Sequence, residues 1–161
     1  MKKTFCFTTA VLAVISITSC SGTKKTDPAP ETPRSQQEVY SGILPAADAD
    51  GIKYTLKLDY SSDPDFKSGI YDLEESYLMV DSLSSDGIKT IQTDNSNGNF
   101  TIFEGEGSNS GKYYLKLVDQ ADSIAATPVF FLVENDSTIT MVNAELQPSP
   151  NPDFNYSLTL Q

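Results

Sequence analysis

The chain lacks histidine and tryptophan altogether, and only two of its 161 residues are cysteines, Cys6 and Cys20. Without an imidazole, neither a Ser-His-Asp triad nor a Cys-His pair can form, and zinc and copper lose a preferred ligand. Methionine is scarce as well: after the first residue only Met79 and Met141 remain, too few for a methionine-rich copper site. We therefore expect no enzyme activity, no metal centre and no other cofactor.

Basic residues are also few, with 11 Lys and Arg against 22 Asp and Glu, which gives a net charge of −11. Such a surface repels nucleic acid and anionic lipid headgroups. We expect no nucleic-acid partner, whereas a cation or a basic protein would be weakly attracted. The alternative interpretation is that the charge only keeps the domain soluble.

The N-terminus carries the pattern of an exported lipoprotein. Two lysines precede an apolar stretch over residues 5–17, and Ile17-Thr18-Ser19-Cys20 has the aliphatic, small, small, Cys order of a bacterial lipoprotein cleavage site. We predict a lipoprotein signal peptide over residues 1–19 and a mature chain anchored in a lipid bilayer through an acylated Cys20, by palmitate or a similar chain. An ordinary secretory signal is the alternative. A transmembrane helix is disfavoured, because it needs about 20 apolar residues and hydroxyl side chains interrupt this run.

The segment after the lipidated cysteine reads as a tether. Residues 21–38 hold three prolines and mostly polar side chains, so they cannot repay the entropy of ordering. We predict a lipidated cysteine with a flexible tether over residues 20–38 and a folded domain over residues 39–161. Position 21 is Ser and not the Asp that retains lipoproteins in the inner membrane of well-studied Gram-negative bacteria. We therefore expect an outer-membrane anchor that faces the periplasm.

From Val39 onward the hydrophobic pattern has the period of two that is typical of β-strands. Strands are predicted near residues 52–60, 71–80, 88–93, 99–104, 113–117, 128–133, 139–141 and 156–160, and one helical turn is possible in 72–79. Turn signals separate them at Asp86-Gly87, Asn97-Gly98, Ser110-Gly111 and Asn135-Asp136. About eight antiparallel strands predict an all-β fold, a barrel in preference to a sandwich, because closure removes exposed edges. Its aromatic side chains are expected to fill the interior; the alternative is a small ligand in the barrel mouth.

Two segments carry a resemblance to a known family. Leu44-Pro45-Ala46-Ala47-Asp48-Ala49-Asp50-Gly51-Ile52 resembles the L-P-C-A-D-C-x-G-I signature of NlpE-type copper-resistance lipoproteins, and it follows Tyr40-Ser41-Gly42 as it does in that family. Near the C-terminus, Asn155-Tyr156-Ser157-Leu158 matches the family's closing N-Y-[ST]-L strand. The resemblance implies a small lipocalin-like β-barrel and a role in copper tolerance, surface sensing or envelope stress.

The resemblance fails at the family's chemistry, because Ala46 and Ala49 stand at the positions of the C-x-x-C cysteines. The copper site is therefore expected to be lost, and what remains in this loop is structural. We expect Pro45 to fix φ, Asp48 to cap the turn, and Gly51 to adopt positive φ before the next strand. The implied function is non-enzymatic and works through contact with an unidentified envelope protein. The alternative is a lipocalin-like carrier or sensor of a small apolar ligand.

Two further segments resemble calcium sites. Asp48 and Asp50 form a partial hard-cation motif, and residues 93–104 place Asn95, Asn97 and Glu104 as in a calcium loop. A simple turn at Asp48–Gly51 and an Asn97-Gly98 hairpin explain the same residues with fewer assumptions. We predict the turn and the hairpin.

Overall fold

The computed structural model describes residues 36–85, 87–120 and 127–161. The predicted signal peptide, Cys20 and the tether up to residue 35 lie outside the described residues. The elements are β1 Gln37–Leu44, β2 Gly51–Asp59, β3 Ser68–Val80, β4 Ile88–Glu104, the 3-10 turn η1 Gly107–Asn109, β5 Tyr113–Asp119, β6 Val129–Asn135, β7 Thr138–Val142 and β8 Ser157–Leu160. Within the part that is described, no helix combines the length and the apolar character needed to cross a membrane.

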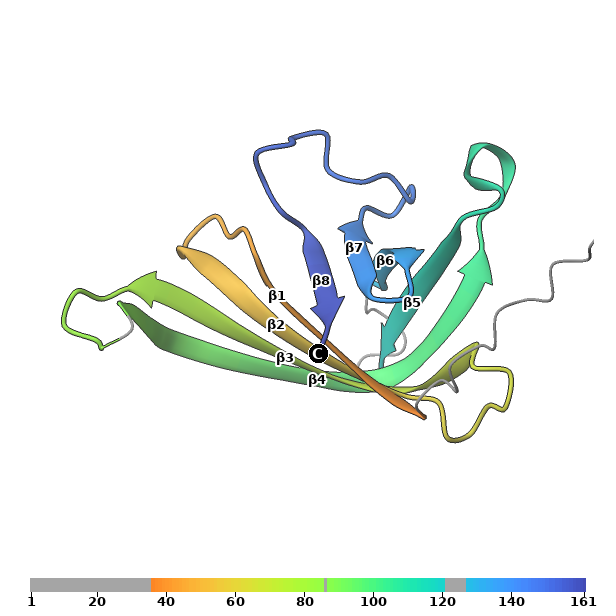
Figure 1. Ribbon diagram of the computed structural model, residues 1–161, viewed down its shortest axis with the longest axis horizontal. Helices are drawn as coiled ribbons and strands as arrows, with labels where there is room; N and C mark the ends of the chain where they lie inside the picture. The colour runs from red at the N-terminus through yellow and green to blue at the C-terminus, as the bar shows by residue number, and fades with distance from the viewer. Residues whose placement is uncertain (1–35, 86, 121–126) are drawn as a thin grey trace, which may run out of the picture. The chain divides into compact units, whose positions relative to one another are not determined.

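Each strand pairs antiparallel with the next, and β8 returns to pair with β1, so the eight strands close into a barrel (Figure 1). The all-β antiparallel barrel predicted from the alternation is confirmed. The possible helical turn in residues 72–79 is absent, because these residues belong to the extended strand β3.

The barrel interior is filled by the apolar residues of the alternating strands. Tyr40 of β1 faces Leu56 of β2, which faces Leu73 of β3, so one row of inward side chains crosses three strands. The ring of Phe100 meets that of Tyr60 edge to face, with ring centres 4.9 Å apart. The buried cluster consists of Tyr40, Leu44, Leu56, Leu58, Tyr60, Tyr71, Leu73, Phe100, Leu115, Leu117, Phe131, Ile139 and Leu158.

Strand β4 differs from the prediction of two strands joined by a hairpin. It is one strand of 17 residues, and Asn97-Gly98 lies in its middle. The predicted Asn97-Gly98 hairpin is therefore wrong, and an extended strand also replaces the calcium-loop alternative. The glycine serves a close approach and not a turn: a Cβ at Gly98 would lie 2.0 Å from the carbonyl oxygen of Val118 on β5.

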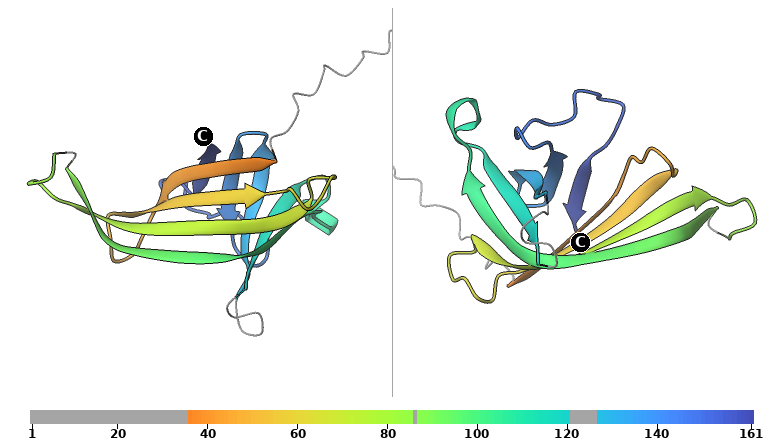
Figure 2. Two further views of the ribbon diagram at one scale, coloured as in Figure 1. Left: turned by 90° about the horizontal axis from the view of Figure 1, so that it is seen from below. Right: turned by 180° about the vertical axis from the view of Figure 1, so that it is seen from behind.

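The first half of β4 extends beyond the barrel wall. β4 pairs with β3 from Ile88 onward, but its pairing with β5 begins only at Gly98. In both views of Figure 2 the β3–β4 hairpin stands out from the rest of the barrel, and β4 is its outermost strand. At the predicted turns, Gly87 and Gly111 have positive φ, and Asn135 Oδ1 accepts a hydrogen bond from Ser137 N at 2.9 Å.

The barrel closes along a short seam between β1 and β8. Tyr40 is opposite Leu160 and Ser41 is opposite Thr159. Gly42 allows this approach, because a Cβ there would lie 2.6 Å from the carbonyl oxygen of Ser157. The two sequence motifs that resemble the NlpE-type family therefore flank the line where the barrel is sealed.

Candidate functional site

The motif loop between β1 and β2 is held by its backbone and by one carboxylate. Leu44 ends β1 inside the core, and the loop over residues 45–50 follows. Asp50 N donates to the carbonyl of Leu78 at 2.9 Å, and Asp50 Oδ2 accepts from Val80 N at 2.6 Å. Asp50 therefore ties the loop to the end of β3.

Gly51 opens β2 for a different reason from the one predicted. Its φ lies outside the positive range, so the expectation of positive φ is wrong. The residue is buried, and a Cβ would lie 2.7 Å from the Cγ2 atom of Ile43. A small residue is needed here to make room for the neighbouring side chain.

Ala46 and Ala49 are half-buried in this loop and present methyl groups, which have no ligand atom for a metal. Pro45 precedes them, also half-buried. Across residues 36–85, 87–120 and 127–161, no three side chains of the Asp, Glu, His or Cys type are grouped so that they could hold a metal ion. The loop connects β1 to β2.

The C-terminal motif is also structural. Asn155 Oδ1 accepts a hydrogen bond from Ser157 N at 3.0 Å, which starts β8. Tyr156 stands one residue before the strand, and its carbonyl accepts from Met141 N at 2.9 Å. Leu158 is fully buried in the core. Ser157 and Leu158 pair with Thr140 and Ile139 of β7, so the motif joins the last strand to the barrel.

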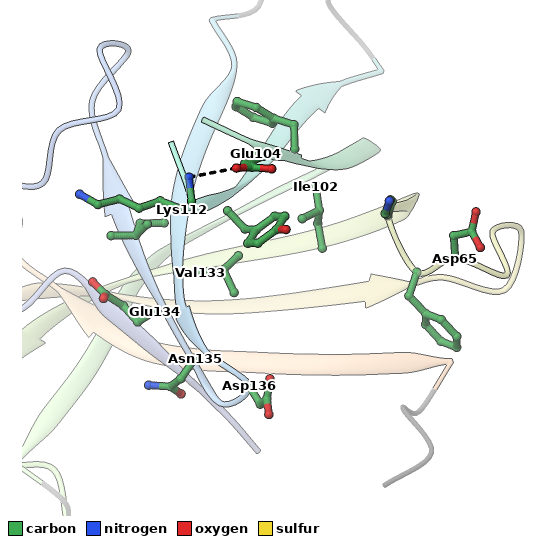
Figure 3. A pocket seen from close by; sticks show the side chains of 14 residues that line it. Asp65, Ile102, Glu104, Lys112, Val133, Glu134, Asn135 and Asp136 are labelled. Carbon is green, nitrogen blue, oxygen red and sulfur yellow. Dashed lines mark hydrogen bonds between the residues drawn. The ribbon is translucent and has the colours of Figure 1, made fainter. Parts of the chain in front are cut away.

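A cavity of about 840 Å³ opens at the end of the barrel where the β2–β3, β4–β5 and β6–β7 connections meet (Figure 3). Ile102 and Val133 lie in its middle, with Asp65, Lys112 and Glu134 around them. Glu104 Oε1 accepts a hydrogen bond from Gly111 N at 3.0 Å, which fixes one side of the opening. The other lining residues include Phe66, Lys67, Phe103, Tyr113, Leu132, Asn135 and Asp136.

This mouth cavity has the volume of a small-molecule site, for which about 300–1,000 Å³ is usual. It is shallow, however, because the next rows inward are closed by Leu115 and Phe131, which are 1% and 0% exposed. Tyr113 in its wall is half exposed to solvent. A ligand would therefore rest at the mouth and could not enter the barrel.

A second, smaller pocket of about 150 Å³ lies between Tyr54, Tyr71, Glu75, Asp119 and neighbouring side chains. Burial raises the pKa of Tyr54 well above its ordinary value, and a hydrogen bond to Glu75 and that residue's negative charge raise it further. Burial also raises the pKa of Tyr71. Tyr54 and Glu75 lie opposite one another on β2 and β3, so they share one face of the sheet, and Tyr54 packs against the core on that face.

Sequence reasoning missed this polar end of the barrel. The signal that could have found it is the phase of β3, in which Glu75 shares a face with the buried Tyr71 and Leu73.

Fold and motifs together define a small antiparallel β-barrel domain sealed by its first and last strands. The chain belongs to the NlpE family: its residues 40–151, well over half of the chain, match the model of the NlpE N-terminal domain. The match includes the Leu44–Ile52 loop and ends before Asn155. Among curated proteins and solved structures, none matches the chain. Family membership indicates an envelope-associated lipoprotein.

Proposed function

We propose that this protein is an outer-membrane lipoprotein that faces the periplasm and acts without catalysis, through contact with another envelope protein, in envelope stress or surface sensing. The observation that carries the proposal is membership of the NlpE family. The proposed role does not include copper binding by this loop, because Ala46 and Ala49 lack the thiolates that the family loop provides.

The filled barrel supports action through the surface of the domain. Its central side chains, such as Phe100, Phe131 and Leu158, are 0–1% exposed and leave no room for a ligand inside. The polar groups at the two ends of the barrel have no imidazole or thiol beside them, because residues 39–161 contain no His and no Cys. What the described part offers to other molecules is therefore mainly its outer strands and loops.

The anchoring part of the proposal is tested by Cys20→Ala in the full chain. The variant should leave the outer-membrane fraction and become soluble in the periplasm, because it cannot be acylated. Cys6→Ala is the matched control, since this cysteine lies within the predicted signal peptide and should leave anchoring unchanged. Unchanged membrane fractionation of Cys20→Ala would contradict the anchor.

The signalling part is tested with a transcriptional reporter of envelope stress in cells that overproduce the chain. We expect the wild-type protein to induce the reporter and Cys20→Ala to induce it to a different level, because the lipid sets the distance between the domain and its partner. No response to the wild-type protein, under conditions where a known stress induces the reporter, would contradict this function.

The mouth cavity favours a second candidate, a carrier or sensor of a small apolar molecule. Ile102, Tyr113 and Val133 give it an apolar floor of suitable size. This function predicts a molecule that co-purifies with the protein and raises its melting temperature by mass action.

A further inference from the structure

The edge of β4 away from β3 is open over a long stretch. Within the residues that the structure describes, no strand pairs with β4 on this side between Lys89 and Ser96, whereas β5 covers the same side from Gly98 to Glu104. We call residues 89–96 the β4 edge. The outermost position of this strand is visible in both views of Figure 2.

Two hydrogen bonds farther along β4 show which residues of the β4 edge direct their backbone N–H and C=O groups toward the open side. Ile102 N donates to Lys67 O on the β3 side at 2.6 Å, and Asn97 O accepts from Gln120 N on the β5 side at 2.9 Å. Because alternate residues of a strand direct their N–H and C=O groups to opposite sides, Thr93 and Asn95 direct theirs toward the open side, as Asn97 does. A further strand placed there would find a ladder ready to pair.

The β4 edge has few of the features that keep edges from pairing. It contains no proline and only one lysine, Lys89, and its residues from 89 to 95 are exposed to solvent. One irregularity in register lies near Ile91, opposite Tyr77 and Leu78, and the strand is regular from there to Gly98. Exposed apolar side chains surround the tip of the same hairpin: Met79, Val80, Leu83, Ile88 and Ile91.

The charges around the β4 edge identify the chemistry of the strand that would pair there. Glu74 of β3 lies opposite Asn95, and the exposed Asp94 of β4 points to the other face, so one carboxylate stands on each face beside the edge. Lys89 is the only basic residue in the whole stretch 68–97. A second copy of this chain would bring the same carboxylates and its own charge of −11, so like charges oppose self-pairing.

We propose that the β4 edge, residues 89–96, binds an extended basic strand of the envelope partner by adding it to the sheet. The proposal deepens the proposed function, on which it rests, by naming the contact surface and the charge of the partner segment. The backbone ladder at Thr93 and Asn95 provides the pairing, and the carboxylates of Glu74 and Asp94 select Lys and Arg in the incoming strand.

The test uses the full chain with Cys20→Ala and two peptide probes of about ten residues, a length usual for a strand. Both alternate threonine and valine; one carries three lysines and the other three glutamates. Binding is measured by fluorescence anisotropy at low and at moderate salt. We expect the basic peptide to bind at least about tenfold more tightly than the acidic one, with an advantage that shrinks as salt rises. Equal binding of the two peptides would overturn the proposal.

Asn95→Pro removes the outward N–H of one edge residue, and Asn95→Ala is the matched control that keeps it. Asn95 makes no side-chain hydrogen bond within the described residues, so the control should bind the basic peptide within about twofold of wild type, whereas Asn95→Pro should bind about tenfold more weakly. Equal binding by both variants would overturn the proposal, as would a dimer of the wild-type chain in sedimentation that Asn95→Pro abolishes.

If Asn95→Pro fails to fold, hydrogen exchange of the Thr93 and Asn95 amides in the protein without that substitution tests whether the β4 edge pairs with the basic peptide. The amides of Thr93 and Asn95 should exchange quickly in the free protein and slow down when the basic peptide is added. Slow exchange of both amides in the free protein would show that the edge is already paired, which overturns the proposal.

The stress reporter separates this proposal from the proposed function. If Asn95→Ala induces the reporter and Asn95→Pro does not, the β4 edge is the contact surface. If Asn95→Pro induces it fully, the edge is not the contact surface and the proposed function stands. If the wild-type chain gives no response, the proposed function fails, and peptide binding still decides whether the edge accepts a basic strand.

Discussion

Phe131→Ala tests whether the barrel interior is a packed core or a ligand space. Phe131 is 0% exposed and lies opposite Leu115 on β5 and Met141 on β7. Truncating such a phenylalanine removes its transfer free energy and leaves a cavity, at a cost of about 3–5 kcal/mol. A domain of this size has about 5–15 kcal/mol of stability in total, so the variant should lose about a fifth or more of it.

Phe130→Ala is the matched control, because it removes the same ring from the adjacent residue on the opposite face of β6. Phe130 is half-buried and meets Phe103 at a ring-centre distance of 6.4 Å, so its loss should cost about 1–2 kcal/mol. In urea titrations with a slope of about 1.5 kcal/mol per M, Phe131→Ala should lower the midpoint by about 2–3 M and Phe130→Ala by about 1 M. Equal shifts, or a cost below about 1 kcal/mol for Phe131→Ala, would refute the packed interior.

Two further predictions concern single residues of the barrel wall. Gly98→Ala should lower the free energy of unfolding by about 2 kcal/mol or more in thermal unfolding, because its Cβ would collide with Val118 O. The control Gly87→Ala should cost less, since φ is +74° there but the space around the residue is open. The reverse order would contradict the placement of Gly98 inside β4. The raised pKa of Tyr54 means that the folded state holds the phenol proton more tightly than the unfolded state does. The contribution of Tyr54 to the free energy of unfolding is therefore fully present below its ordinary pKa near 10 and is lost as pH rises above that value. Tyr54→Phe should flatten this decline between about pH 9 and about pH 11, and unchanged slopes would show that burial beside Glu75 does not govern it.

The architecture was readable from the sequence because inward residues alternate over most strands. In β2, Leu56 and Leu58 are buried while Lys57 between them is exposed, which is the pattern of a barrel wall. Closure of the barrel was predicted because it removes exposed strand edges, and the structure confirms the closed barrel.

The sequence was ambiguous in the polar part of β4. The run from Gln92 to Asn97 has no apolar residue, so alternation could not mark it as a strand, and Asn97-Gly98 is a strong turn signal. Pairing with β3 from Ile88 to Thr101 supplies the order that the local pattern lacks. From sequence alone, a glycine that lets a neighbouring strand come close looks the same as a glycine in a turn. The two can be distinguished only when the strand that packs beside the glycine is known.

A ligand in the barrel mouth was an alternative from the sequence, but the residues that line the mouth cavity could not be predicted. Its walls come from three connections far apart in the chain, with Phe66, Tyr113 and Val133 brought together only by barrel closure. The motif loop was located correctly, but the roles within it depend on contacts with the end of β3 that sequence does not show. One such contact is the hydrogen bond that Asp50 Oδ2 accepts from Val80 N.

The most direct test of the account is native mass spectrometry of the Cys20→Ala chain, recovered from the periplasm without refolding, with and without added Cu⁺ and Ca²⁺. If the barrel is filled and the protein acts by protein contact, the spectrum should show the bare polypeptide mass under all these conditions. A reproducible additional mass in near-equal proportion to the protein, lost in Val133→Asp at the floor of the mouth cavity, would contradict it and make the protein a small-molecule carrier or sensor.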